Sequence, residues 1–188
     1  MSSELKTNKI SPATGTALQI GDSGDTITIP SGATLTNSGT ATGFGKVLQV
    51  VQTVKGSTSS TTSTSFVDVS GLSVSITPAS TSNKVLVFVT LGGVGNSSNT
   101  VYMNLMRGAT AIAQPDSGSY PASINNFPGG SSSQMGGSLV VLDTPSTTSS
   151  TTYKIQFRVD AGTGFLNRHI STADHNTVST ITAMEIAG

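Results

Sequence analysis

The chain has 188 residues, a mass of 19.0 kDa, a net charge of zero and no cysteine. The lack of cysteine excludes disulfide frameworks and thiolate metal sites, and the nine scattered basic residues argue against nucleic acid as a partner, because phosphate binding needs a concentrated basic face. This length suits one β domain with an extension.

The composition is polar but weakly charged. Serine and threonine make up roughly a third of the chain, and the charged share of 10% is far below the usual value of about 25%. The apolar residues nevertheless gather in alternating or continuous runs of strand length. No stretch sustains a helical apolar pattern over three turns. We therefore expect an ordered, all-β protein.

Residues 1–45 differ from the rest. Two stretches, "NKISPATGTALQIGDSG" and "DTITIPSGATLTNSGTATG", each carry a short apolar alternation, a Pro/Gly turn and a second short piece, as in a loose repeat of roughly 15–20 residues. The matching positions are Ile10, Pro12, Gly15 and Leu18 in the first copy and Ile29, Pro30, Gly32 and Leu35 in the second. Strands this short are marginal alone, so we expect them to wind with identical chains into a β-rich shaft. A flexible linker is the alternative.

From residue 46 the chain predicts a series of strands. They are "KVLQVVQTVK" (46–55), "SFVDVSGLSVSITP" (65–78), "KVLVFVTL" (84–91), "VYMNLMRGATAIAQ" (101–114), "GGSLVVLD" (136–143), "TYKIQFRVD" (152–160), the weaker "GFLNRHI" (164–170) and "VSTITAMEIAG" (178–188). About nine or ten strands with turn signals between them are typical of a sandwich or barrel. We predict an antiparallel jelly-roll β-sandwich over residues 46–188.

The alternation within two strands predicts which side chains face the core. The strand at 65–78 should turn Phe66, Leu72, Val74 and Ile76 inward, with a turn at Ser70-Gly71. The strand at 152–160 should turn Tyr153, Ile155, Phe157 and Val159 to one face. The stretch "GSTSSTTSTS" (56–65) is expected to be a loop too polar to pack, and Arg107-Gly108 to be the turn of a hairpin.

Residues 84–91 are apolar on both faces, unlike a strand with one side in water. The runs "SLVVLD" and "VYMNLM" add to an apolar surface larger than one sandwich can hide. A monomer would then expose a patch beyond the few hundred Å² usually tolerated. We therefore predict subunit contacts on residues 84–91. The alternative is that a single sandwich buries all of it.

Several of these stretches resemble a known group of proteins. The pieces "SFVDVSGLSVSITPASTSNKVLVFVTL", "LVVLDTPSTTSSTTYKIQFRV" and "STITAMEIAG" resemble the head domains of phage tail-fibre and related virion proteins and, more distantly, the trimeric jelly rolls of the C1q and tumour-necrosis-factor type. The stretch "ELKTNKISPATGTALQIGDSGDTITIPSGATLTNSGT" is similar to the segments that precede such heads. The resemblance implies a homotrimer, with residues 1–45 attached to other virion proteins and a distal binding head.

The sequence offers little for catalysis or metal binding. His169 and His175 lie near Asp174, but no GxSxG elbow accompanies them and loop histidines are mostly solvated. The acidic residues that a polysaccharide hydrolase would need are few, and Asp68, Asp143 and Asp160 sit at strand ends where turn roles suffice. We expect no enzyme activity, no cofactor and no metal site.

The long loop at 114–137 is the most informative candidate for binding, because long ordered loops are often functional. It carries Asp116, Tyr120, Asn125, Asn126 and Phe127. Aromatic faces can stack on sugar rings while amides bond hydroxyls. We expect a contact with a host cell-surface glycan, the alternative being that Tyr120 and Phe127 plug the end of the sandwich or a neighbouring subunit.

Together these features favour a virion structural protein, a tail fibre or head fibre that recognises the host surface. The alternative is a capsid decoration or tail adaptor protein with a purely structural role. The start "MSSELKTNKISPATG" lacks the apolar core of a secretory signal, and no window has the ~20 apolar residues of a membrane span. We expect synthesis in the host cytoplasm, assembly into the virion and no membrane insertion.

Overall fold

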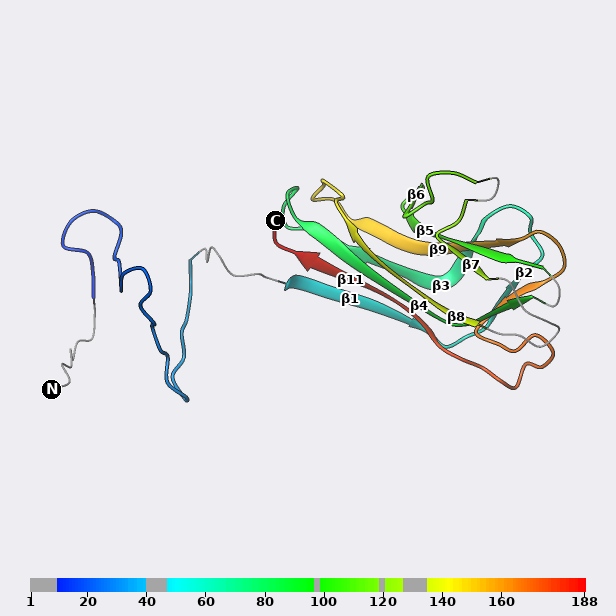
Figure 1. The fold of residues 1–188 in the computed structure, drawn as a ribbon, viewed down its shortest axis with the longest axis horizontal. Helices are drawn as coiled ribbons and strands as arrows, with labels where there is room; N and C mark the ends of the chain where they lie inside the picture. Colours follow the sequence, from blue (N-terminus) through cyan, green and yellow to red (C-terminus); the bar gives the residue numbers. More distant parts are fainter. Residues whose placement is uncertain (1–9, 40–46, 97–98, 119–120, 127–134) are drawn as a thin grey trace. The chain divides into compact units, whose positions relative to one another are not determined.

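The computed structural model describes residues 10–39, 47–96, 99–118, 121–126 and 135–188. The chain divides into two units between Phe44 and Gly45, and each unit is described by itself. The described residues form strands, turns and irregular segments without a helix (Figure 1). In this part of the chain, therefore, no helix exists that could cross a membrane.

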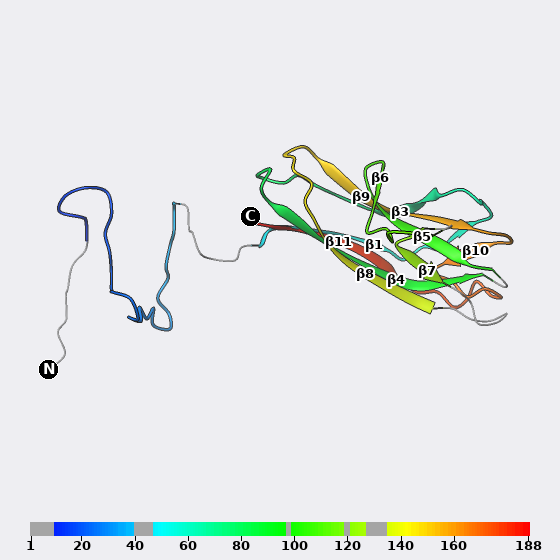
Figure 2. The same ribbon diagram turned by 45° about the horizontal axis from the view of Figure 1, so that its top comes forward.

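The second unit consists of two antiparallel sheets that pack face to face (Figure 2). Sheet A contains β1 (Val47–Lys55), β2 (Ser59–Thr61), β4 (Lys84–Asn96), β8 (Met135–Asp143), β10 (Gly164–Leu166) and β11 (Ser179–Ile186). Sheet B contains β3 (Val67–Ile76), β5 (Val101–Arg107), β6 (Thr110–Ile112), β7 (Ile124–Asn126) and β9 (Thr151–Val159). The predicted all-β, antiparallel sandwich is confirmed.

The strand order shows how the chain builds this sandwich. In sheet A, β11 lies between β1 and β4, β8 pairs with the other edge of β4, and β10 joins the last residues of β4 to β2. In sheet B, β9 lies between β3 and β5, and β6 and β7 pair with β5. The long strands β1, β3, β4, β5, β8, β9 and β11 alternate between the two sheets, so each connection between consecutive long strands passes from one sheet to the other.

The core forms where the period-two alternation of the two sheets meets. Val85, Val87, Val89 and Leu91 of β4 are buried, as are Ile181 and Ala183 of β11. The four predicted positions of β9, Tyr153, Ile155, Phe157 and Val159, are all buried against them. The face assignment of β9 is confirmed, since a strand without a bulge keeps its alternation throughout.

The prediction for β3 is partly wrong because the strand contains a bulge. Leu72, Val74 and Ile76 are buried as expected, but Val69 is buried too. The pairing register with β9 shifts between Asp68 and Ser73, and Gly71 has a φ of 77°, a left-handed conformation that glycine adopts easily.

This bulge reverses the alternation on its N-terminal side. Phe66, predicted to face inward, is therefore only half-buried and lies against the guanidinium of Arg158. The turn predicted at Ser70-Gly71 is the bulge itself. The expectation that residues 56–65 are a loop too polar to pack is also wrong, since β2 within this stretch pairs with β10 and Thr61 is buried.

The first unit, described over residues 10–39, forms no strand within the single chain. Local turns shape it: the N–H of Asp25 donates to the carbonyl of Asp22 at 3.1 Å, and the N–H of Ala33 donates to the carbonyl of Pro30 at 3.1 Å. Its large apolar side chains are all exposed, namely Ile10, Leu18, Ile20, Ile27, Ile29 and Leu35. These residues form no core of their own, and the β-rich shaft remains a prediction.

Candidate functional site

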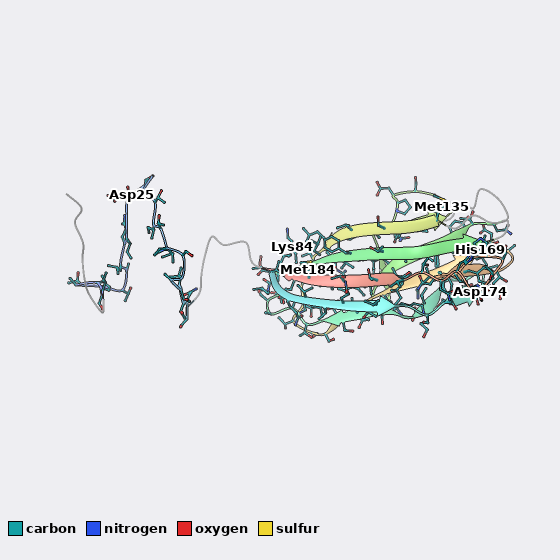
Figure 3. The ribbon with its side chains drawn as sticks, turned by 90° about the horizontal axis from the view of Figure 1, so that it is seen from below. Asp25, Lys84, Met135, His169, Asp174 and Met184 are labelled. Atoms are coloured by element: carbon teal, nitrogen blue, oxygen red, sulfur yellow. The ribbon has the colours of Figure 1, made fainter. Side chains whose placement is uncertain are left out.

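The outer side of sheet A carries exposed large apolar side chains, and Figure 3 shows the strands of this sheet from below. The pairing registers align Val50, Met184, Leu86 and Leu142 in one row across β1, β11, β4 and β8. The next row contains Gln52, Thr182, Phe88 and Val140. Val50 and Val140 are each 56% exposed and Leu142 is 54% exposed. We call this surface, with the neighbouring Val47 and Leu48, the apolar face.

The apolar face is almost free of charge. Within the described strands β1, β4, β8 and β11, the charged residues are Lys55, Lys84, Asp143 and Glu185. Lys55 and Glu185 are buried, and Asp143 is half-buried and bonded to Arg107 of sheet B. Only Lys84, at the beginning of β4, is an exposed charge. A surface of this kind is unfavourable in water and suits a partner that is also uncharged.

The outer side of β5, in contrast, is covered by the chain itself. Its outward residues Tyr102, Asn104 and Met106 are buried. The side chain of Gln114 donates hydrogen bonds to Asn104 Oδ1 at 3.2 Å and to Ser123 Oγ at 2.9 Å. The segment after β6 therefore lies over β5, and the "VYMNLM" run needs no neighbouring subunit. The prediction of an uncovered apolar surface holds for residues 84–91 and for β8.

The structure describes part of the candidate loop 114–137. Asp116 is exposed in the segment after β6, and Asn125 is exposed in β7. Asn126 ends β7, where its backbone pairs with Val101. Tyr120 and Phe127 lie outside the described residues. Within the described residues the side chains of Asp116 and Asn125 form no hydrogen bond to each other. The described part of the loop therefore does not bring its candidate residues together in one site.

Asn125 is aligned with a cluster on the outer side of sheet B that the sequence did not predict. The registers place Asn125 opposite Tyr102, and Tyr102 opposite Arg158. The guanidinium carbon of Arg158 lies 4.1 Å from the ring centroid of Tyr102 and 5.5 Å from that of Phe66. Such stacking is a cation–π interaction. We call Phe66, Tyr102, Arg158 and Asp160 the Arg158 cluster.

Asp160 completes the Arg158 cluster. Its carboxylate accepts hydrogen bonds from the hydroxyl of Tyr102 at 2.8 Å and from Nη1 of Arg158 at 3.2 Å. Burial, and next the hydrogen bond to Asp160, raise the pKa of Tyr102 above its ordinary value, so the phenol remains a donor at neutral pH. The cluster links β5, the end of β9 and Phe66, the residue before β3, and its Asp160 is exposed to solvent. No short motif encodes it, because it depends on strand register.

The acidic residues assigned to turns have other roles. Asp68 accepts a hydrogen bond from Lys154 at 2.7 Å, and Asp143 pairs with Arg107 at 2.8 Å. Asp160 pairs with Arg158 as described. All three therefore form ion pairs with basic side chains of sheet B, a role that the sequence did not predict.

His169 and His175 lie close together on the loop between β10 and β11, and Figure 3 labels His169 and Asp174 of this loop. The ring centroids of the two histidines are 5.7 Å apart with the rings edge to face, and the backbone N–H of His169 donates to the carbonyl of His175 at 3.0 Å. The carboxylate of Asp174 accepts a hydrogen bond from the hydroxyl of Thr172. Among the described residues, no group of three or more His, Asp or Glu side chains is placed to hold a metal ion.

The comparisons with known proteins add no relative. No protein-family model matches the chain, and no curated protein matches it either. The function is therefore inferred from the fold, the apolar face and the loops at the end of the sandwich.

Proposed function

We propose that this chain is a non-enzymatic structural protein of a bacteriophage particle, a tail or head fibre that attaches to the host surface. Residues 1–45 attach to other virion proteins and wind together, and residues 46–188 form the head of a homotrimer. The observation that carries this proposal is the apolar face, a broad surface that the second unit does not cover with its own described residues.

A further copy of the chain is the best partner for the apolar face. Burying apolar surface gains about 25 cal/mol per Å², and the exposed side chains include Val50, Phe88, Val140 and Leu142. When identical subunits meet, like charges on the contact surface repel. The apolar face has only Lys84 as an exposed charge. Copies of the face can therefore pack together with little repulsion between like charges.

Two further features support a trimeric fibre. The long strands alternate between the sheets, an order that agrees with a double-sheet jelly roll of the kind expected for such heads. Within residues 10–39, the described part of the first unit, six large apolar side chains are exposed and none is buried. Three parallel copies of this segment could bury those side chains against one another, as a shaft requires.

Host recognition is assigned to the end of the sandwich opposite the start of β1. The candidate residues are Asp116, Tyr120, Asn125, Asn126 and Phe127, and of these Asn125 and Asn126 belong to β7, which pairs with the first residues of β5 at this end. Asn125 borders the Arg158 cluster, which offers exposed polar groups beside aromatic rings. This combination suits a cell-surface glycan.

The test is adsorption of phage to host cells in the presence of purified chain. We expect the wild-type chain to compete with the phage, and a chain with Tyr120→Ala and Phe127→Ala to compete poorly while keeping its native mass. Loss of the oligomer in that variant would show that the two aromatic residues pack between subunits, and would oppose the binding role.

The alternative function is a capsid decoration or tail adaptor protein, and the apolar face favours it too, because such a face could cement neighbouring virion proteins. The two functions differ in what is lost when the chain is absent. Intact, stable particles that no longer infect would support recognition. Particles that fall apart would support cementing.

A further inference from the structure

A concave site lies between the β5–β6 turn and the loop from β8 to β9, at the end of the sandwich away from β7. It has a volume of about 340 Å³ and is lined by Arg107, Gly108, Pro145, Thr147, Ser150, Thr151 and Thr152. We call it the Arg107 pocket. Its size falls at the lower end of ligand pockets, which are about 300–1,000 Å³. The β8–β9 loop lies near the C-terminus (Figure 1).

The guanidinium of Arg107 is held in place by a chain of hydrogen bonds. Its Nη1 atom donates to the two carboxylate oxygens of Asp143 at 2.8 and 3.0 Å and to the carbonyl of Thr144 at 3.3 Å. Asp143 also accepts a hydrogen bond from the hydroxyl of the fully buried Tyr153 at 2.6 Å. A buried anchor therefore fixes an arginine at the surface of the pocket.

The opposite edge of the same guanidinium remains available. Within the described residues, Nε and Nη2 of Arg107 donate no hydrogen bond. These two N–H groups are parallel, and such a pair binds both oxygens of a carboxylate at once. The side chain of Arg107 lines the pocket and is 32% exposed.

The hydroxyls of the pocket add further donors. Thr147 Oγ1 accepts a hydrogen bond from the N–H of Ser149 at 3.0 Å, which leaves its own proton available. The hydroxyl of Ser150 forms no hydrogen bond within the described residues. Both oxygens of Asp143 are already bonded. The pocket is therefore rich in donors, and no acidic residue lines it, although the carboxylate of Asp143 is bonded to Nη1 of Arg107.

We propose that the Arg107 pocket binds the carboxylate of an acidic sugar, with both carboxylate oxygens on Nε and Nη2 of Arg107. The hydroxyls of Thr147 and Ser150 bond the oxygens of the sugar, and the ring of Pro145 contacts its apolar side. This inference rests on the proposed role in host-surface recognition and deepens it, because it names a uronic-acid type of glycan and a second binding position on the head.

The test is a titration of the full chain, labelled with ¹⁵N, by methyl glucuronide. Methyl glucoside is the control that lacks the carboxylate, and acetate is the control that lacks the sugar. We expect saturable shifts of the amide signals of residues 107–108 and 147–152, with a dissociation constant on the order of 1 mM. Methyl glucoside and acetate should each bind at least tenfold more weakly.

Two variants assign the binding to Arg107. Arg107→Lys keeps the positive charge but loses the parallel N–H pair, and should weaken the binding of methyl glucuronide at least tenfold. Lys154→Gln removes a cation from the same sheet outside the pocket and should leave the binding unchanged. Amide signals far from residue 107 check that both variants keep the fold.

Several results would overturn the inference. They are an absence of saturable shifts, equal binding of methyl glucoside or acetate, and unchanged binding by Arg107→Lys. The proposed function fails separately. A chain that competes for adsorption but does not bind methyl glucuronide refutes the pocket alone, whereas a chain that binds the sugar but does not compete refutes host recognition and keeps the pocket.

Discussion

Phe88 of β4 lies opposite Val140 of β8 on the outer side of sheet A, with the two side chains 37% and 56% exposed. Directly opposite pairs of this kind stabilise a sheet, but here water contacts both. On the other side of β4, Val87 and Val89 are buried in the core. The strand is therefore apolar on both sides, and its outer side is the surface on which we propose that a second copy packs.

A charge placed on the apolar face should separate the subunits without unfolding them. We expect Phe88→Glu to shift the native mass, measured by light scattering, from an oligomer to a monomer, because a carboxylate buried between subunits is costly. Ser73→Glu, an exposed position on β3, is the matched control and should keep the oligomer. If both variants remain oligomeric, the contact lies elsewhere.

The core should tolerate truncation poorly. Leu105 of β5 is fully buried, and Leu105→Ala should lower the free energy of unfolding by about 2–5 kcal/mol through lost burial and a cavity. Val67 at the start of β3 is exposed, so Val67→Ala should change it by less than about 0.5 kcal/mol. Urea unfolding at a fixed protein concentration measures both. Equal effects would contradict the assigned core.

A buried carboxylate should stabilise the connection between β3 and β4. Glu185 is 2% exposed, and its Oε1 accepts hydrogen bonds from the N–H of Ala79 and from Nδ2 of Asn83, each at 2.6 Å. Glu185→Ala leaves these donors unsatisfied and should cost about 1–3 kcal/mol. Glu185→Gln keeps an acceptor oxygen and should cost less. Urea unfolding distinguishes them, and the opposite ranking would argue against these bonds.

Alkaline pH should destabilise the sandwich partly through Tyr153. Burial, followed by the hydrogen bond to Asp143, raises the pKa of Tyr153 well above its ordinary value. The unfolded chain releases this proton above a pH of about 10 while the folded chain retains it, so stability falls as the pH rises further.

Tyr153→Phe should remove this contribution. The decline in the free energy of unfolding above a pH of about 10 should become shallower, by up to about 1.4 kcal/mol per pH unit. Unfolding by urea at several alkaline pH values measures the slope. A variant with the slope of the wild type would show that Tyr153 does not retain its proton in the folded chain.

The strands that the sequence predicted best are those in which one strong pattern decides the structure. The alternation from Tyr153 to Val159 needs only one buried face, and all four inward positions were predicted. In β3 the bulge near Gly71 reverses the alternation of buried and exposed residues. The sequence around Gly71 does not reveal that residues before the bulge face the opposite way from the pattern after it. Phe66 was therefore assigned to the wrong face.

The site could be predicted less well than the fold, because its residues come together through pairing at long range. Arg107 meets Asp143, and Tyr102 meets Arg158 and Asp160, only once β5, β8 and β9 have found their register. The apolar excess of residues 84–91 was visible in the sequence, since it depends on composition alone. The cover of β5 by the segment that includes Gln114 and Ser123 was not.

The most direct test of the account is the native mass of the chain by light scattering, compared with a chain that begins at Gly45. We expect a native mass of three times 19.0 kDa for the full chain. The shorter chain should also be a trimer, because the apolar face belongs to the second unit. A monomeric shorter chain would contradict the role of the apolar face. Monomers of both would contradict the fibre.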